Sequence, residues 1–181
     1  MPGHEIRLID DDGVEVPPGG TGEVVGRSPA MMNGYHGRAQ ATRDAEWYDA
    51  QGNRYIRHGD VGRFDEDGFL ILMDRKKDLI ISGGYNIYPS DLEAVLLRHP
   101  AVADASVIGV PSQAWGETPV GFYVPHTGEN ASAADIMAWV NGEVGKTQRL
   151  SALHPIEELP RSAIGKVLKR ELRDRVTEQA A

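Results

Sequence analysis

The stretch DRKKDLIISGGYNIYPSDLE, residues 74–93, divides the sequence into two parts of different character. Its first five residues are all charged, and they interrupt an apolar pattern that runs to residue 73 and resumes at residues 79–81. A charged break between two apolar segments is typical of a domain boundary. We therefore expect a first domain over residues 1–73, a connecting segment at 74–76 and a second domain over residues 77–181.

Upstream of this break the sequence predicts short strands joined by tight turns. Alternating apolar residues on either side of Asp10–Gly13 indicate a hairpin. The proline and glycine residues of PPGGTG at 17–22 indicate a turn. The predicted elements are strands at 23–27, 54–57 and 69–73 and a short helix at 39–46. The first domain is therefore expected to be β-rich.

Downstream of the break the periodicity becomes mixed. Ser90 and Glu93 have the spacing of a capping box at a helix start, and Pro100 follows the apolar stripe of that helix. Two buried strands are expected at 105–110 and 120–124, followed by helices near Ser132 and over residues 167–176. The fold class predicted is α+β: a small β-rich segment, then a compact α+β domain with a small central sheet and about three helices.

Composition and net charge limit the classes of molecule that this chain is expected to bind. The chain has 181 residues, of which 40% are hydrophobic and 25% charged, as in ordinary globular proteins, and no apolar run or leader suggests a membrane or secretory segment. We expect a cytoplasmic protein. The absence of cysteine excludes disulfides, thiolate metal sites and a cysteine nucleophile, and the six histidines show no metal-ligand spacing. A net charge of -8 disfavours nucleic acid and anionic membranes, so a small ligand is the expected partner.

Three segments have residues suited to chemistry, although each has a plain structural interpretation as well. Asp60 follows a glycine at a predicted strand end, where a carboxylate can accept both hydroxyls of a ribose or can simply be a solvated loop residue. Gly83-Gly84 allows close approach of a ligand or forms a tight turn, and it matches no phosphate-binding loop. Lys166 follows a glycine at a predicted helix start, where a cation is disfavoured unless it meets a negative group.

Taken together, these segments resemble, in their order, spacing and residues, the motifs of the adenylate-forming superfamily of acyl-CoA synthetases, peptide-synthetase adenylation domains and luciferases. The likeness extends over nearly the whole chain, from GGTGE at residues 19–23 and MNGY at 32–35 to the lysine segment PRSAIGK at 160–166. SGGYNIYP at residues 82–89 resembles the acyl-CoA synthetase branch most. The resemblance implies an ATP-dependent carboxylate–CoA ligase that forms an acyl-adenylate and then an acyl-CoA thioester.

The resemblance also implies a role for each residue of the motifs. Asp60 would hold the ribose hydroxyls of ATP, and Arg75 would assist it. Lys166 would be the catalytic residue, bridging the substrate carboxylate and the α-phosphate during adenylation. Asp74, within the segment 74–76, would be the hinge, and the turn residues would line the channel for the pantetheine thiol: Gly83, Gly84 and Tyr85.

The substrates implied are ATP with Mg²⁺, coenzyme A and a carboxylic acid, with no tightly bound cofactor or resident metal. The family's phosphate loop and acyl pocket lie N-terminal to everything in this sequence, so the missing N-terminal domain is an expected partner. The chain alone is expected to be inactive. The acid, whether fatty, aromatic or short and dicarboxylic, is not specified by this portion.

Two departures and two alternatives accompany this interpretation. His58 stands where the family usually has threonine, and GKTQRL at 145–150 replaces a tyrosine-lysine-x-proline segment. The basic residues of GKTQRL would touch coenzyme A phosphates or form a solvated loop. The alternatives are an adenylation domain that loads a carrier protein, and a non-catalytic interaction module that keeps the lid fold. Retention of Asp60, Arg75 and Lys166 together speaks against the module.

Overall fold

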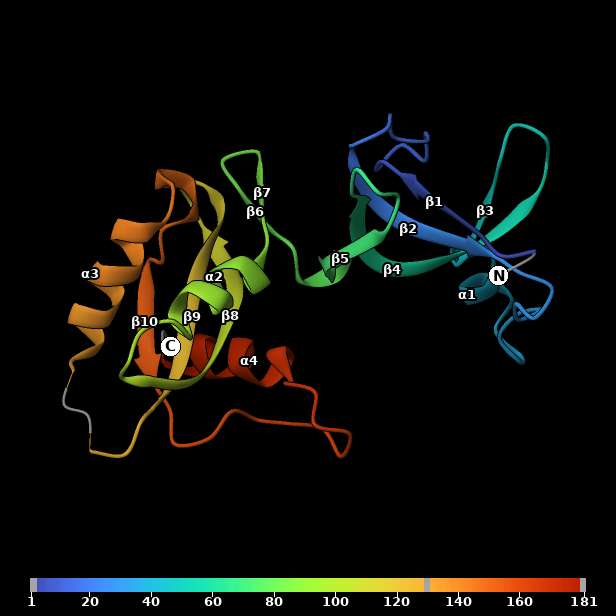
Figure 1. Cartoon of the computed structure of the whole chain (residues 1–181). Helices are drawn as coiled ribbons and strands as arrows, with labels where there is room; N and C mark the ends of the chain where they lie inside the picture. Colours follow the sequence, from blue (N-terminus) through green and yellow to red (C-terminus); the bar gives the residue numbers. More distant parts are fainter. Residues whose placement is uncertain (1–2, 129–130, 180–181) are drawn as a thin grey trace. The chain divides into compact units, whose positions relative to one another are not determined.

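A computed structural model of the chain describes residues 3–128 and 131–179. The fold is α+β, as predicted, and comprises two compact units, of which the first ends at Lys77 and the second begins at Asp78 (Figure 1). Within the described ranges, no helix combines the length and the apolar character needed to cross a membrane.

The first unit is built on an antiparallel sheet. Its strands run in the order β1-β2-β4-β3, and β5 pairs with β4 as well. Ile9, Val25 and Tyr55 form its fully buried core, against which Trp47 packs. The elements are β1 (Glu5–Ile9), β2 (Thr21–Arg27), α1 (Ala39–Asp44), β3 (Glu46–Tyr48), β4 (Arg54–Phe64) and β5 (Leu70–Arg75), followed by a 3-10 turn (Lys76–Asp78).

Strand β4 is much longer than the sequence suggested, and it continues through the glycine that we took for a turn. Gly59 has a φ of 71°, a conformation that favours glycine. The register of β4 shifts near it, against β2 between Arg57 and Val61 and against β5 between Val61 and Gly62. A glycine at such an irregularity bends and twists a strand without ending it. Asp60 therefore lies inside β4, and the prediction of a strand end there was wrong.

The second unit has a five-stranded sheet covered on both faces. The strand order is β10-β9-β6-β7, with β8 paired to β9, and β10 runs parallel to β9 while the other pairs are antiparallel. The elements are β6 (Ile80–Ser82), β7 (Tyr85–Ile87), α2 (Pro89–Leu96), β8 (Val102–Ser112), β9 (Gly116–Pro125), α3 (Ala133–Glu143), a 3-10 turn (Lys146–Gln148), β10 (Ala152–Pro155) and α4 (Lys169–Gln179).

The alternation of side chains along β8 explains the two covered faces. Val107 belongs to a core cluster with Leu92 of α2 and Ile136 of α3, whereas the next residue, Ile108, belongs to a separate cluster with Leu172 of α4. Successive strand residues point to opposite faces, so α2 and α3 cover one face of the sheet and α4 covers the other. Because α4 packs on this face, the C-terminal end of the segment that precedes α4 is fixed to the second unit.

Two helix starts test the capping predictions. Ser132 caps α3 and accepts a hydrogen bond from the Asp135 amide, as expected. The capping box at Ser90 and Glu93 was wrong, because the N-cap of α2 is Tyr88, two residues earlier, and the helix begins at Pro89. Proline at the first helical position needs no amide partner and has the required φ. Glu93 turns to other partners: the Val107 amide and the Lys169 ammonium, both at 2.9 Å.

Candidate functional site

Asp60 and Arg75 are brought together by the pairing of β4 with β5. They stand directly opposite each other in the register, and Arg75 Nε lies 2.9 Å from Asp60 Oδ1. A second guanidinium nitrogen of Arg75 donates to the His58 carbonyl at 3.3 Å. The Asp60 side chain remains 25% exposed, so its carboxylate is oriented by an arginine and still open to a ligand.

Asp60 also lines a cleft of about 420 Å³ within the first unit. Its walls are largely apolar and include Ile6, Val24, Met31, Ile56, Leu70 and Leu72. The His58 side chain lines the same cleft and rests against Gly26, where an added Cβ would lie 2.6 Å from His58 Nε2. The unusual histidine is therefore accommodated by a glycine on the neighbouring strand, and its imidazole borders the space that Asp60 faces.

The residues at 74–78 differ in how firmly they are held. Asp74 is part of β5 and pairs with Val61. Lys76 Nζ lies 2.9 Å from Asp11 and 3.0 Å from Glu23, which is nearly buried. Burial lowers the pKa of the Lys76 ammonium, but hydrogen bonds to these two carboxylates outweigh that effect and raise it. On the other side of the boundary between the units, Asp78 pairs with Arg173 of α4 at 3.1 Å.

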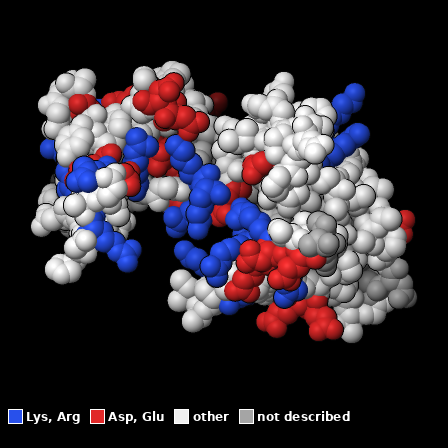
Figure 2. All heavy atoms as spheres, turned by 180° about the vertical axis from the view of Figure 1, so that it is seen from behind, with Lys and Arg blue, Asp and Glu red and all other residues white. Residues whose placement is uncertain are grey.

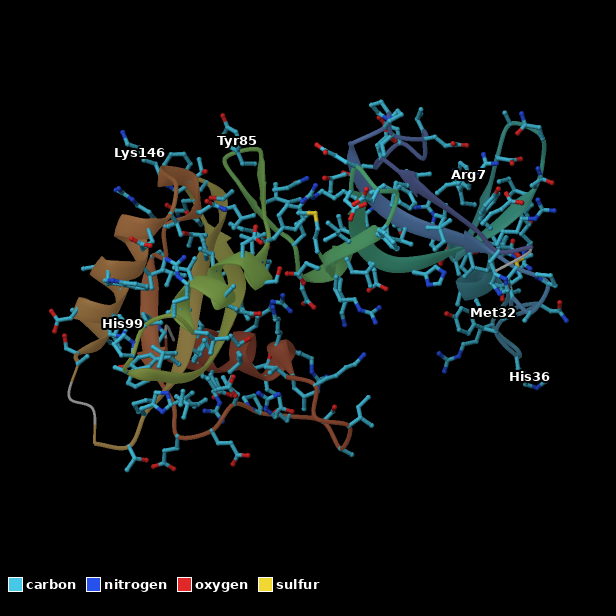
Figure 3. All side chains as sticks on the ribbon, viewed as in Figure 1. Arg7, Met32, His36, Tyr85, His99 and Lys146 are labelled. Atoms are coloured by element: carbon cyan, nitrogen blue, oxygen red, sulfur yellow. The ribbon has the colours of Figure 1, made fainter. Side chains whose placement is uncertain are left out.

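The glycine pair at 83–84 forms the turn of the β6–β7 hairpin, with φ values of 58° and 82°. The Gly83 amide donates to the Trp115 carbonyl at 2.8 Å, and a Cβ on Gly83 would lie 2.9 Å from the Trp115 ring. Tyr85, 63% exposed, stands beside the tip of this hairpin (Figure 3). The turn thus needs glycine both for its backbone and for its contact with Trp115, a neighbour that sequence reasoning did not assign to the site.

Lys166 lies in a narrow hairpin between β10 and α4, three residues before the helix begins. Arg161 and Val167 form an antiparallel bridge, the Ser162 amide donates to the Lys166 carbonyl, and Gly165 has a φ of 80°. The predicted position at a helix start was wrong, because Lys166 follows a turn at 162–165 and α4 begins only at Lys169. The helix dipole therefore does not explain this lysine. The hairpin instead presents an exposed ammonium to solvent.

Side chains of both charge signs lie on both units. On the face shown in Figure 2, both units carry lysine and arginine as well as aspartate and glutamate. Asp60 with Arg75 belongs to the first unit, and Lys166 with the Gly83-Gly84 turn belongs to the second. Each unit therefore carries its own part of the residue set that the sequence singled out.

Residues 91–166 match the model of the AMP-binding enzyme C-terminal domain. The match covers only this part of the chain, and the resemblance to adenylate-forming acyl-CoA synthetases is confirmed. The chain is 42% identical to 2-succinylbenzoate–CoA ligase of Bacillus mycoides over 94% of its own length and 34% of the relative. It therefore spans about a third of the length of the curated relatives it matches.

Solved structures agree with this assignment. ATP-bound MatB from Rhodopseudomonas palustris is similar with a TM-score of 0.88 and 30% identity over 97% of this chain and 34% of that chain. The o-succinylbenzoate CoA synthetase of Bacillus subtilis, in complex with the acyl-adenylate OSB-AMP, is similar with a TM-score of 0.83 and 35% identity over 96% and 34%. Both of these similar structures hold a nucleotide, ATP in the first and an acyl-adenylate in the second.

Proposed function

We propose that this chain is the C-terminal part of an ATP-dependent carboxylate–CoA ligase, which forms an acyl-adenylate and pyrophosphate and then lets coenzyme A displace AMP. The observation that carries the proposal is the coexistence of an arginine-oriented Asp60, a Gly83-Gly84 turn and an exposed Lys166 in a chain whose relatives are CoA ligases. An interaction module has no chemical use for such a set.

In this proposal Asp60 accepts the two ribose hydroxyls of ATP while Arg75 holds the carboxylate in place. A carboxylate has two acceptor oxygens and suits a vicinal diol, and the apolar cleft wall beside it suits an uncharged ring. Magnesium enters with the ATP phosphates. Within residues 3–128 and 131–179, no group of three His, Asp or Glu side chains is placed to hold a metal by itself.

Lys166 supplies the charge stabilisation of the first step. A carboxylate oxygen attacks the α-phosphorus of ATP, the bond to the β-phosphate breaks and pyrophosphate leaves. A positioned ammonium stabilises the charge on the α-phosphate oxygens as this AMP transfer proceeds. Its four-carbon stem lets the ammonium follow the moving oxygens. In the second step the pantetheine thiol passes the Gly83-Gly84 turn beside Tyr85, where a Cβ on Gly84 would meet no neighbouring atom and the missing side chain leaves room.

The change between the two steps requires a pivot, and the contacts around the boundary of the units favour Lys77 over Asp74. Asp74 lies in a paired strand, Lys76 is held by two carboxylates and Asp78 by Arg173. Lys77, between them, makes no side-chain hydrogen bond or ion pair with any residue that the structure describes. We propose Lys77 as the residue whose backbone angles change.

A proline at this position tests the pivot. Lys77→Pro is expected to keep adenylation near the parental rate and to slow thioester formation about tenfold or more, since proline fixes φ near -65°. Lys77→Ala is the control and should retain both half-reactions. Rapid-quench measurement of the two steps in the complete ligase checks this, and parental thioester formation by Lys77→Pro would contradict it.

The acid class and the type of acceptor can be determined by ATP–pyrophosphate exchange across fatty, aromatic and short dicarboxylic acids, with and without coenzyme A. For the complete protein, we expect carboxylate-dependent exchange and a diversion of the adenylate to thioester when coenzyme A is added. Exchange that ignores coenzyme A would instead favour an adenylation domain for a carrier protein, and no exchange with any acid would favour the interaction module. The 181-residue chain by itself is expected to show none.

A further inference from the structure

The guanidinium of Arg161 joins two parts of the second unit. Its Nη1 donates to the Gly165 carbonyl at 2.7 Å, and its Nη2 lies 2.6 Å from Asp104 Oδ2. Gly165 directly precedes Lys166, and Asp104 is part of strand β8, which lies in the central sheet. One planar group therefore connects the sheet to the peptide unit from which Lys166 extends.

The other hydrogen bonds of this hairpin are all internal to it. The Ser162 amide donates to the Lys166 carbonyl and the Gly165 amide to the Ser162 carbonyl, both at 2.8 Å, and the Ser162 hydroxyl accepts from the Lys166 amide at 3.2 Å. These bonds give the hairpin its shape but do not fix it to the sheet. In the described part of the chain, the contact of Arg161 with Asp104 is the only hydrogen bond or ion pair that ties residues 161–166 to a residue outside 160–168.

The carboxylate of Asp104 is oriented for its contact with Arg161 by a backbone amide. Its Oδ1 accepts the Ala105 amide at 2.9 Å, which orients the carboxylate and leaves Oδ2 to Arg161. The rigid fork of a guanidinium can meet a carboxylate and a carbonyl in one plane, which a single ammonium does less well. The two side chains remain 40% and 35% exposed, so the ion pair contributes little to the stability of the fold. Its main consequence is geometric.

We propose that Arg161, oriented by Asp104, is a positioning residue for Lys166 in the adenylation step. The inference rests on the proposed function, because it concerns where Lys166 is held and not whether Lys166 acts. The tip of the hairpin is otherwise exposed, with Ile164 at 79% exposure, so this contact restricts the positions that the lysine can take. Figure 1 shows the hairpin as a long connection between β10 and α4.

The test compares Arg161→Gln and Asp104→Asn with Arg98→Gln in the complete ligase. Arg98 is the matched control, because it too is an exposed arginine of the second unit paired with a carboxylate, Glu143. We expect Arg161→Gln and Asp104→Asn each to lower the kcat of pyrophosphate exchange by about ten- to a hundredfold, the effect of a displacement near 1 Å at a reacting group. The KM for ATP, the melting temperature and thioester formation from added acyl-adenylate should stay at the values of the control.

A second readout follows the loop itself. Hydrogen exchange of the segment 160–168, measured on the intact ligase by mass spectrometry, should be faster in Arg161→Gln than in Arg98→Gln, while β8 and α4 exchange as before. Adenylation by Arg161→Gln at the control rate would overturn the proposal. Equal losses in both half-reactions together with a lower melting temperature would also overturn it, since that pattern indicates a structural role only.

Lys166→Ala in the same exchange assay separates this inference from the proposed function. If Lys166→Ala abolishes exchange while Arg161→Gln leaves it unchanged, the function stands and the positioning role fails. If Lys166→Ala exchanges at the parental rate, the proposed function of the lysine fails and the positioning inference fails with it.

Discussion

Lys166→Ala is expected to lower the rate of acyl-adenylate formation by about 10²–10³, with a much smaller effect on the KM for ATP. The range is typical of removing one preorganised group that stabilises charge in a transition state. The lysine is exposed and lies in a closed hairpin outside the core clusters, so its truncation should leave the fold intact. Pyrophosphate exchange by the complete ligase, at saturating carboxylate, measures the loss.

The same variant should convert added acyl-adenylate to thioester at nearly the parental rate, because the thiol step does not need the ammonium at the α-phosphate. Arg170→Ala provides a matched control, as it removes an exposed cation at the start of α4, four residues further along the chain. A Lys166→Ala variant that lost both half-reactions equally, or neither, would contradict the role assigned to this lysine.

Asp60→Ala is expected to raise the Kd for ATP by about 10- to 100-fold, since hydrogen bonds to a charged group contribute roughly 1.5–3 kcal/mol each. Truncation also leaves Arg75 without its carboxylate partner, but this pair is partly exposed and stabilises the fold little. Isothermal titration of the complete ligase with ATP, in the absence of carboxylate, measures the change directly.

Glu66→Ala is a suitable comparison for Asp60→Ala, because Glu66 is an exposed carboxylate in the turn between β4 and β5. The control should bind ATP as the parent does, which separates a local contact from a general effect of net charge. Asp60→Asn should fall between the two, since the amide keeps one acceptor oxygen. ATP binding by Asp60→Ala at the parental affinity would remove Asp60 from the nucleotide site.

The sequence predicted the strands and helices best where hydrophobic period and end signals agree. The strands around residues 105–110 and 120–124 and the helix after Ser132 are found as β8, β9 and α3. The predictions were wrong at residues whose local sequence is compatible with two different structures. Gly59 indicated a turn but bends a continuous strand, and the Ser90–Glu93 spacing indicated a capping box but follows a proline that starts the helix.

The contacts within the candidate site could not be predicted from local sequence either. The pairing of Asp60 with Arg75 depends on the register of two strands separated by a turn, and the contact of Arg161 with Asp104 joins residues 57 positions apart. Neither contact leaves a periodic signal in the sequence, so only motif resemblance could suggest the first and nothing suggested the second. Trp115 was likewise missed, because its proximity to Gly83 arises from the packing of two hairpin turns.

If this chain completes a carboxylate–CoA ligase, mass spectrometry should detect the thioester product. The complete protein is incubated with ATP, Mg²⁺, coenzyme A and the acid that gives the fastest pyrophosphate exchange. We expect acyl-CoA and AMP in equal amounts, and we expect Lys166→Ala to form neither. An acyl-adenylate that accumulates without any thioester, whatever the concentration of coenzyme A, would contradict it.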